Sequence, residues 1–191
     1  MNPNQQKSKK VSRLQGFTIV ELMVTISIAA ILMAVAAPNY TTFIRNSQLS
    51  DAVGEFMTAA NAARGNAIKQ GINTFLVPAT GTDWSTGWYV FADGNWDGVY
   101  SASDPKDVLV MQSPSPNTIL TVTTPTASTL ASGYLLFNGS GYPKMTNGGL
   151  GSGRLKIANG TTRAIIISIN TTGRVRSCVE NTTTCKDTSP N

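Results

Sequence analysis

The segment from Asp93 to Asp104 gathers the side chains in this sequence that are best suited to hold a cation. Its oxygen-bearing residues and one glycine match positions one, three, five, six, nine and twelve of a calcium-binding EF-hand loop: Asp93, Asn95, Asp97, Gly98, Ser101 and Asp104. An EF-hand loop lies between two helices and ends in glutamate, whereas this segment lies between two strand-like runs and ends in aspartate. A hairpin turn requires the same residue types. The pattern leaves calcium binding and a turn as alternatives and favours the turn.

Basic side chains gather towards the carboxyl end of the chain. Residues 140–191 hold seven of them against two acidic ones, namely Lys144, Arg154, Lys156, Arg163, Arg174, Arg176 and Lys186. Arg174 and Arg176 are two apart on an expected strand end, so both side chains leave the same face, and Gly173 permits the tight turn that presents them. Paired guanidinium groups suit phosphate oxygens. A solvated edge strand protected by charge is the alternative. The segment 83–107 is the reverse, with five acidic residues against Lys106.

Histidine is absent from all 191 residues. Its absence removes Ser-His-Asp and Cys-His nucleophilic catalysis, histidine-ligated zinc and haem, and the commonest general base near neutral pH. Charged residues make up only 13% of the chain and apolar residues 41%, with 17 glycines. Such a composition is typical of turn-rich β structure and not of a disordered polyelectrolyte. The sequence therefore predicts a protein that is not an enzyme and needs no cofactor.

The amino-terminal part of the chain has the pattern of a membrane anchor. Residues 1–16 contain four basic residues and no acidic one, and they end in Gly16, after which an apolar stretch runs from Phe17 to Ala37. A helix of this length, at about 1.5 Å per residue, reaches the roughly 30 Å of a bilayer core. The preceding positive charges predict that this end stays in the cytoplasm and that the rest of the chain lies outside.

Glu21 interrupts this apolar stretch. A carboxylate near the membrane interior costs on the order of 2.5–3.5 kcal/mol on insertion scales, so such a residue is expected to be functional and to have a partner. A single-pass anchor with an incidental glutamate is the alternative interpretation.

The segment Gly16-Phe17-Thr18-Ile19-Val20-Glu21-Leu22 closely resembles the type III signal of type IV pilins and pseudopilins. The resemblance implies that a prepilin peptidase cleaves after Gly16 and methylates the new amino terminus at Phe17. It also implies that Glu21 meets the amine of a neighbouring Phe17 in a filament, and that the chain moves from the inner membrane, its globular part in the periplasm, to a surface pilus. This pairing is physically reasonable, because a buried carboxylate and a buried ammonium group compensate each other's desolvation cost only when the two subunits are in register.

Cys178 and Cys185 are the only cysteines. Because the carboxyl-terminal part is expected to face an oxidising periplasm, we predict a disulfide between them. Closing so short a loop contributes about 2.5 kcal/mol on the loop-entropy argument. A metal site is disfavoured, because it needs four nitrogen or sulfur ligands.

A long helix and a β-rich region are expected after the anchor. Apolar residues recur at helical spacing through residues 39–70, with a bend expected at Pro38 and an end at Gly71. Eight strand-like runs follow, at 73–78, 87–91, 108–111, 118–123, 134–137, 154–157, 164–169 and 173–176. The helix has the apolar face needed to cover an antiparallel sheet. The sequence thus predicts an α+β pilin fold with a leader (1–16), a membrane half of the helix (17–38), an amphipathic half (39–70) and a β domain (71–191).

Later segments resemble the GspH/FimT family of minor pilins and pseudopilins. They are Gly87-Trp88-Tyr89-Val90-Phe91 with the acidic turn after it, Phe137-Asn138-Gly139-Ser140-Gly141, and Gly173-Arg174-Val175-Arg176. The resemblance implies a minor pilin that assembles with other pilin subunits and binds DNA for uptake in natural transformation. Arg174 and Arg176 would carry this binding, with Gly173, Lys186, Arg154, Lys156 and Arg163 in support. A structural minor pilin, or a type II secretion pseudopilin that touches only other subunits, is the alternative.

Overall fold

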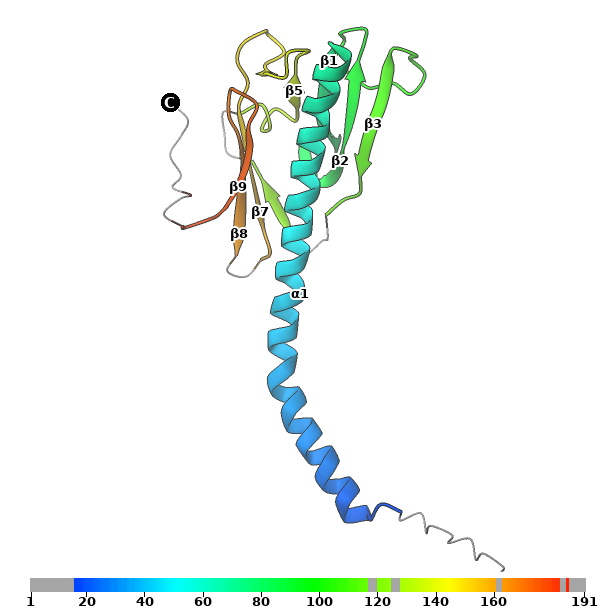
Figure 1. Ribbon diagram of the computed structural model, residues 1–191, viewed down its shortest axis with the longest axis vertical. Helices are drawn as coiled ribbons and strands as arrows, with labels where there is room; N and C mark the ends of the chain where they lie inside the picture. Colours follow the sequence, from blue (N-terminus) through cyan, green and yellow to red (C-terminus); the bar gives the residue numbers. More distant parts are fainter. Residues whose placement is uncertain (1–15, 117–119, 125–127, 161–162, 183–184, 186–191) are drawn as a thin grey trace, which may run out of the picture. The chain divides into compact units, whose positions relative to one another are not determined.

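The computed structural model describes residues 16–116, 120–124, 128–160, 163–182 and 185, with the side chains of 36–38 left aside (Figure 1). The chain forms two compact units, Met1–Thr42 and Phe43–Asn191. Helix α1 (Ile19–Gln70) contributes to both. It ends at Gln70 as predicted, and Gly71 follows with a φ of 71°. Because that conformation costs glycine little, Gly71 lets the chain leave the helix and enter the first strand.

In the first unit, α1 begins where the hydroxyl of Thr18 accepts the backbone N–H of Glu21 at 3.2 Å. The hydroxyls of Thr25 and Ser27 donate to the carbonyls of Leu22 and Met23, so these polar groups are satisfied inside the helix. Apolar side chains are exposed all along it. Within the described residues no single helix is both long and apolar enough to cross a membrane. The bent pair Ile19–Val35 and Asn39–Gln70 could do so by length and composition, and its break includes Pro38.

The second unit contains two antiparallel sheets. The first has the order β3-β2-β1-β5-β6 and the second the order β4-β7-β8-β9. The strands are β1 (Asn73–Thr80), β2 (Asp83–Asp93), β3 (Asp107–Ser113), β4 (Thr121–Thr123), β5 (Leu135–Phe137), β6 (Pro143–Lys144), β7 (Gly153–Ala158), β8 (Ala164–Ile169) and β9 (Val175–Val179). All eight predicted runs overlap a strand, and only the two-residue β6 was not expected. The α+β class is confirmed, but the β domain is divided into two sheets, a division that the alternation of apolar residues along single strands does not encode.

One stripe of α1 forms the core together with both sheets. Leu49, Val53, Phe56, Ala60, Ala63 and Ala67 are at most 6% exposed, which confirms the predicted buried face. Phe56 meets the rings of Trp84 and Trp88 edge-on, at centroid distances of 5.4 and 5.3 Å. The small alanines further along let the backbone of α1 approach the sheets closely. Figure 1 shows this half of the helix lying across both sheets.

A smaller aromatic cluster stabilises the first sheet next to the acidic loop, which comprises residues 93–107 and runs from the end of β2 to the start of β3. Phe75 and Phe91 stack at 5.3 Å, and Tyr89, Tyr100 and Tyr134 pack around them. Burial, and then the neighbouring Tyr100, raise the pKa of Tyr89 above its ordinary value. Because Tyr100 belongs to the loop between β2 and β3, the cluster fixes that loop to the sheet.

Candidate functional site

The turn between β8 and β9 presents the two arginines that the sequence singled out. The side-chain oxygen of Asn170 accepts the backbone N–H groups of Thr172 and Arg174, at 3.2 and 2.9 Å. Gly173 has a φ of 80°, and its N–H donates to the Asn170 carbonyl at 2.9 Å. Asparagine is well suited to such turns because its side chain can replace a backbone acceptor. The turn is therefore closed by its own hydrogen bonds.

Strand register brings three arginines onto one face of the second sheet. Ser168 of β8 lies opposite Arg154 of β7 on one side and Arg176 of β9 on the other. Residues directly opposite each other share a face of the sheet, so Arg154 and Arg176 lie on the same face. Two strand spacings separate their Cα atoms by about 10 Å. Arg174 lies directly before β9 and two residues before Arg176, so extending the strand alternation by one residue assigns it to the same face. Both Arg174 and Arg176 are exposed.

The other basic residues proposed from the sequence do not join this group. Lys156 lies on the same face but forms an ion pair with Glu180, with an Nζ to Oε1 distance of 2.6 Å. Arg163 is at the far end of the β7–β8 hairpin, where its carbonyl accepts the N–H of Asn159. By strand alternation it belongs to the face of Ile165 and Ile167, opposite to that of Arg154. Lys186 lies outside the described residues.

Arg64 of α1 is the residue at this site that the sequence analysis missed. Its guanidinium donates to three backbone carbonyls, those of Gly141 at 3.0 Å, Gly173 at 3.1 Å and Thr172 at 3.2 Å. A single side chain thus fastens the helix to the Asn138–Tyr142 loop and to the turn that carries Arg174. Planar guanidinium donors suit several acceptors at once. The sequence did contain one indication. The positions three and four residues on either side of Arg64 hold no acidic residue, so the guanidinium has no ion-pair partner on its own helix and is expected to bind elsewhere.

Two glycines make this contact possible. Gly141 and Gly173 have φ values of 77° and 80°. A Cβ at Gly173 would lie 2.7 Å from the Gly141 carbonyl oxygen, and one at Gly141 would lie 2.6 Å from the Ile68 side chain. Any larger residue would push the loop and the turn away from α1.

We predict that Arg64→Gln loosens the β8–β9 turn without unfolding the domain. The variant removes hydrogen bonds from a charged donor to partly buried and exposed loop carbonyls, while the core stripe of α1 stays intact. Hydrogen exchange should show faster exchange, by about tenfold, at the amides of Gly173 and Arg174 and unchanged exchange in β8. Lys69→Gln is the matched control, because it removes the same charge from an exposed position of the same helix. Equal protection of the turn in both variants would contradict the prediction.

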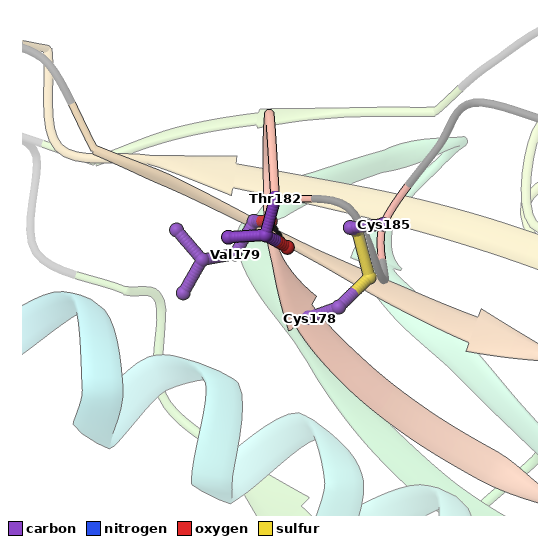
Figure 2. Close-up of a disulfide and its surroundings, with 4 residues drawn as sticks. All are labelled: Cys178, Val179, Thr182 and Cys185. Atoms are coloured by element: carbon purple, nitrogen blue, oxygen red, sulfur yellow. Dashed lines mark hydrogen bonds between the residues drawn. A yellow bond between two sulfur atoms is a disulfide. The ribbon is translucent and has the colours of Figure 1, made fainter.

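The predicted disulfide between Cys178 and Cys185 is present, with a Cα–Cα distance of 5.6 Å (Figure 2). Cys178 is in β9 and Cys185 is 7% exposed. Between them, the hydroxyl of Thr182 donates to the Val179 carbonyl at 2.8 Å, and the N–H of Cys185 donates to the Thr182 carbonyl at 2.9 Å. The bond closes the chain into a short loop directly after the strand that carries Arg176.

We expect the protein secreted to an oxidising compartment to weigh two hydrogens less than the dithiol form. Because the loop is short and lies at the sheet edge, reduction should expose the segment after β9 more than the core. Intact-mass and hydrogen-exchange measurements before and after reduction check both statements. Two titratable thiols in unreduced native protein would rule the bond out.

The acidic loop is ordered by its own hydrogen bonds. Asp93 is 1% exposed, and its two carboxylate oxygens accept the N–H groups of Trp96 and Gly98 at 2.6 and 2.9 Å. The Asn95 amide donates to the carboxylates of Asp97 and Asp104 at 2.8 and 2.9 Å. Among the described residues no group of three acidic or cysteine side chains is placed to hold a metal ion. The bonds have the pattern expected for the turn interpretation.

The residues of the predicted processing signal lie at the start of α1. Gly16 and Phe17 precede the helix, Phe17 is 79% exposed, and nothing lies within 4 Å of a Cβ placed at Gly16. Glu21 is exposed in the first turn, and no hydrogen bond or ion pair of its carboxylate is found among the described residues. Gly16, Phe17 and the Glu21 carboxylate are therefore exposed in the described part of the chain.

Comparison with known proteins decides the family. The model of "Type II transport protein GspH" matches residues 52–173, more than half of the chain, and that of the "Prokaryotic N-terminal methylation motif" matches residues 12–37. The chain belongs to the GspH family. It is a type IV pilin-like protein. The GspH match covers α1 from residue 52 onwards, including Arg64, and the acidic loop, and it ends at Gly173, immediately before the two exposed arginines.

Curated relatives of this GspH-family chain are matched over shorter segments. Prepilin peptidase-dependent protein D of Escherichia coli is 36% identical over 32% of this chain and 42% of its own length. Fimbrial protein EcpC of Eikenella corrodens is 35% identical over 36% of this chain and 58% of its own length. The matches thus span about half the length of these relatives. The crystal structure of the type IV minor pilin FimU of Pseudomonas aeruginosa covers 70% of this chain and 90% of its own, with a TM-score of 0.53 and 18% identity, and it shows the same fold.

Proposed function

We propose that this GspH-family protein is a minor pilin that is built into a type IV pilus and binds DNA without sequence preference. It is anchored in the inner membrane by residues 17–38, cut by a prepilin peptidase after Gly16 and methylated at Phe17, and its globular part faces the periplasm before assembly. The methylation motif over residues 12–37 supports the processing steps. The absence of histidine from the sequence supports a role without catalysis.

The exposed arginines at the free edge of β9 carry the DNA-binding part of the proposal. β9 is the last strand of its sheet, and Arg174 and Arg176 project from it beside Arg154. The turn before β9 is held by Arg64 and the chain after it by the disulfide. Because the backbone is held on both sides of Arg174 and Arg176, binding phosphates costs these side chains less loop entropy than it would on a loose tail.

The shape of this edge favours phosphate contacts over base contacts. A strand end with a short turn does not fill the major groove as a helix or a two-stranded ribbon does, so it has no means of reading base edges. With about three or four phosphate contacts, the logarithm of affinity should fall with the logarithm of salt concentration with a slope near −3, and affinity should be on the order of micromolar.

The test is a fluorescence-anisotropy titration of the full chain in detergent micelles with duplexes of equal length and unrelated sequence, at several salt concentrations. We expect equal affinities for all sequences and the slope given above. The proposal fails if no binding occurs at low salt, or if the duplexes differ strongly.

A structural role without DNA binding is the second candidate. The extent of the GspH match favours it, because it covers residues 52–173 and relates the chain to a type II transport protein. In that case the chain primes a filament and touches only other subunits. Assembly with no DNA binding at low salt would support this second function.

A further inference from the structure

Trp96 is presented to solvent by a strained backbone. Its side chain is 69% exposed, and its φ of 69° is in the left-handed region, which is costly for a residue with a side chain. The buried Asp93 carboxylate stabilises this conformation by accepting the Trp96 N–H at 2.6 Å. The other two tryptophans, Trp84 and Trp88, are buried. A large aromatic ring held outward at a conformational cost points to a contact with another molecule.

The loop around Trp96 is organised before any partner arrives. Asp93 also accepts the N–H of Gly98, the Asn95 amide joins Asp97 to Asp104, and Tyr100 packs into the aromatic cluster. A surface fixed in this way loses little entropy when it binds. Its exposed apolar residues, Val99, Val108 and Leu109, are between 43% and 64% exposed and extend the contact area onto the start of β3.

The charge of this surface restricts the chemistry of its partner. The segment from Asp93 to Asp107 carries four carboxylates and one ammonium group, but only Asp97 and Asp104 reach the surface, because Asp93 and Asp107 are 1% and 8% exposed and accept backbone N–H groups. Trp96 and Asp97 border a cleft of about 750 Å³ whose lining also includes Phe75, Met145 and Lys144. Negative charge repels DNA and other polyanions, whereas a cation over an indole face is attracted by the ring. A guanidinium group from a protein surface fits both features.

The same chain carries a surface with the complementary charge at its opposite edge. Arg174 and Arg176 are exposed beside β9, one edge strand of the second sheet, while the acidic loop leads into β3, one edge strand of the first. Figure 1 shows β3 and β9 on opposite sides of the domain. The two surfaces therefore cannot meet within one molecule, but they can meet between two.

We propose that the Trp96 surface, formed by the Asp93–Asp107 loop and the start of β3, is the docking site for a second copy of this chain. The second copy places Arg174 or Arg176 of its β8–β9 turn against Trp96 and Asp97. The contact joins two different surfaces, so it is heterologous and can repeat from copy to copy. The copy at one end of such a row keeps its arginines free, which leaves them available to DNA.

The test uses two complementary full-length variants expressed together in the membrane. The acceptor carries a photo-crosslinking p-benzoylphenylalanine at Val99 with Arg174→Glu and Arg176→Glu, so it keeps only the Trp96 surface. The donor carries Trp96→Ala and Asp97→Lys, so it keeps only the arginines. We expect no crosslink for the acceptor alone and, in the mixture, a product that stops at two chains and maps to the β8–β9 turn. A donor with Arg174→Lys and Arg176→Lys should retain part of this product because its charge is conserved.

Three results would overturn the proposal: the acceptor crosslinking to itself, crosslinks only to other proteins, or no crosslink although both variants form the disulfide and resist protease. Trp96→Ala, in a chain whose only other change is p-benzoylphenylalanine at Val99, separates docking from DNA binding. It should reduce self-crosslinking at least tenfold without lowering the affinity for DNA. If the chain that keeps Trp96 crosslinks to itself but does not bind DNA, the proposed function is wrong, whereas if it binds DNA but does not crosslink to itself, this inference is wrong.

Discussion

The Glu21→Ala chain should be processed and remain in the membrane, yet be absent from filaments. The Glu21 carboxylate is exposed in the first turn of α1, and no partner for it is found among the described residues. In a bundle of such helices the substitution would leave the amino terminus of a neighbouring subunit without its counter-charge. An unpaired buried charge would destabilise the assembled filament by about 3–5 kcal/mol. Immunoblots of membrane and sheared filament fractions should show at least a hundredfold loss from the filament fraction.

Two further variants separate processing from pairing. Gly16→Arg should block cleavage and leave a chain 16 residues longer, because the bond after Gly16 is the predicted cut. Thr25→Ala is the matched control for Glu21, one helical turn away, since the Thr25 hydroxyl already donates to the Leu22 carbonyl within the helix. It should be processed and assembled normally. Normal entry of the Glu21→Ala chain into filaments would refute charge pairing.

The features that the sequence predicted well are those with a local period. The buried stripe of α1 from Leu49 to Ala67 and the end of the helix at Gln70 follow from apolar spacing and from the glycine after it. The strands β1, β7 and β8 follow from short β-branched runs between turn residues. The common direction of Arg174 and Arg176 stays a prediction, because Arg174 lies just before β9.

The features that it missed depend on contacts between distant residues. Arg64 and the Thr172 carbonyl are 108 residues apart, so the lack of an acidic partner near Arg64 could single out this residue but not identify the carbonyls that it contacts. The ion pair of Lys156 with Glu180 depends on the pairing order of β7, β8 and β9. The position of Arg163 depends on where the hairpin reverses. A charge count over residues 140–191 treats these side chains as equal, whereas strand register separates the exposed Arg174 and Arg176 from the paired Lys156 and from Arg163.

Replacing both Arg174 and Arg176 with glutamine should lower the affinity for DNA equally for all sequences. Each guanidinium that contacts a phosphate releases a counterion, so losing two contacts costs on the order of 50-fold at 0.1 M salt and reduces the salt slope from about −3 to about −1. The fold should not change, because both side chains are exposed and the backbone bonds of the turn remain. Anisotropy titrations at several salt concentrations measure both quantities, and transformation frequency should fall with the affinity.

The matched control for this pair is the double variant Lys144→Gln and Arg163→Gln. It removes the same charge from the same basic half of the chain, but Lys144 lies in β6 of the other sheet and Arg163 lies directly before β8, at the far end of the β7–β8 hairpin. If DNA responded only to net charge, both double variants would lose affinity equally. If the face formed by Arg154, Arg174 and Arg176 is the binding site, the control should lose less than about threefold and keep a slope near −3. Equal losses would therefore remove the assignment to the β9 edge even if the chain binds DNA.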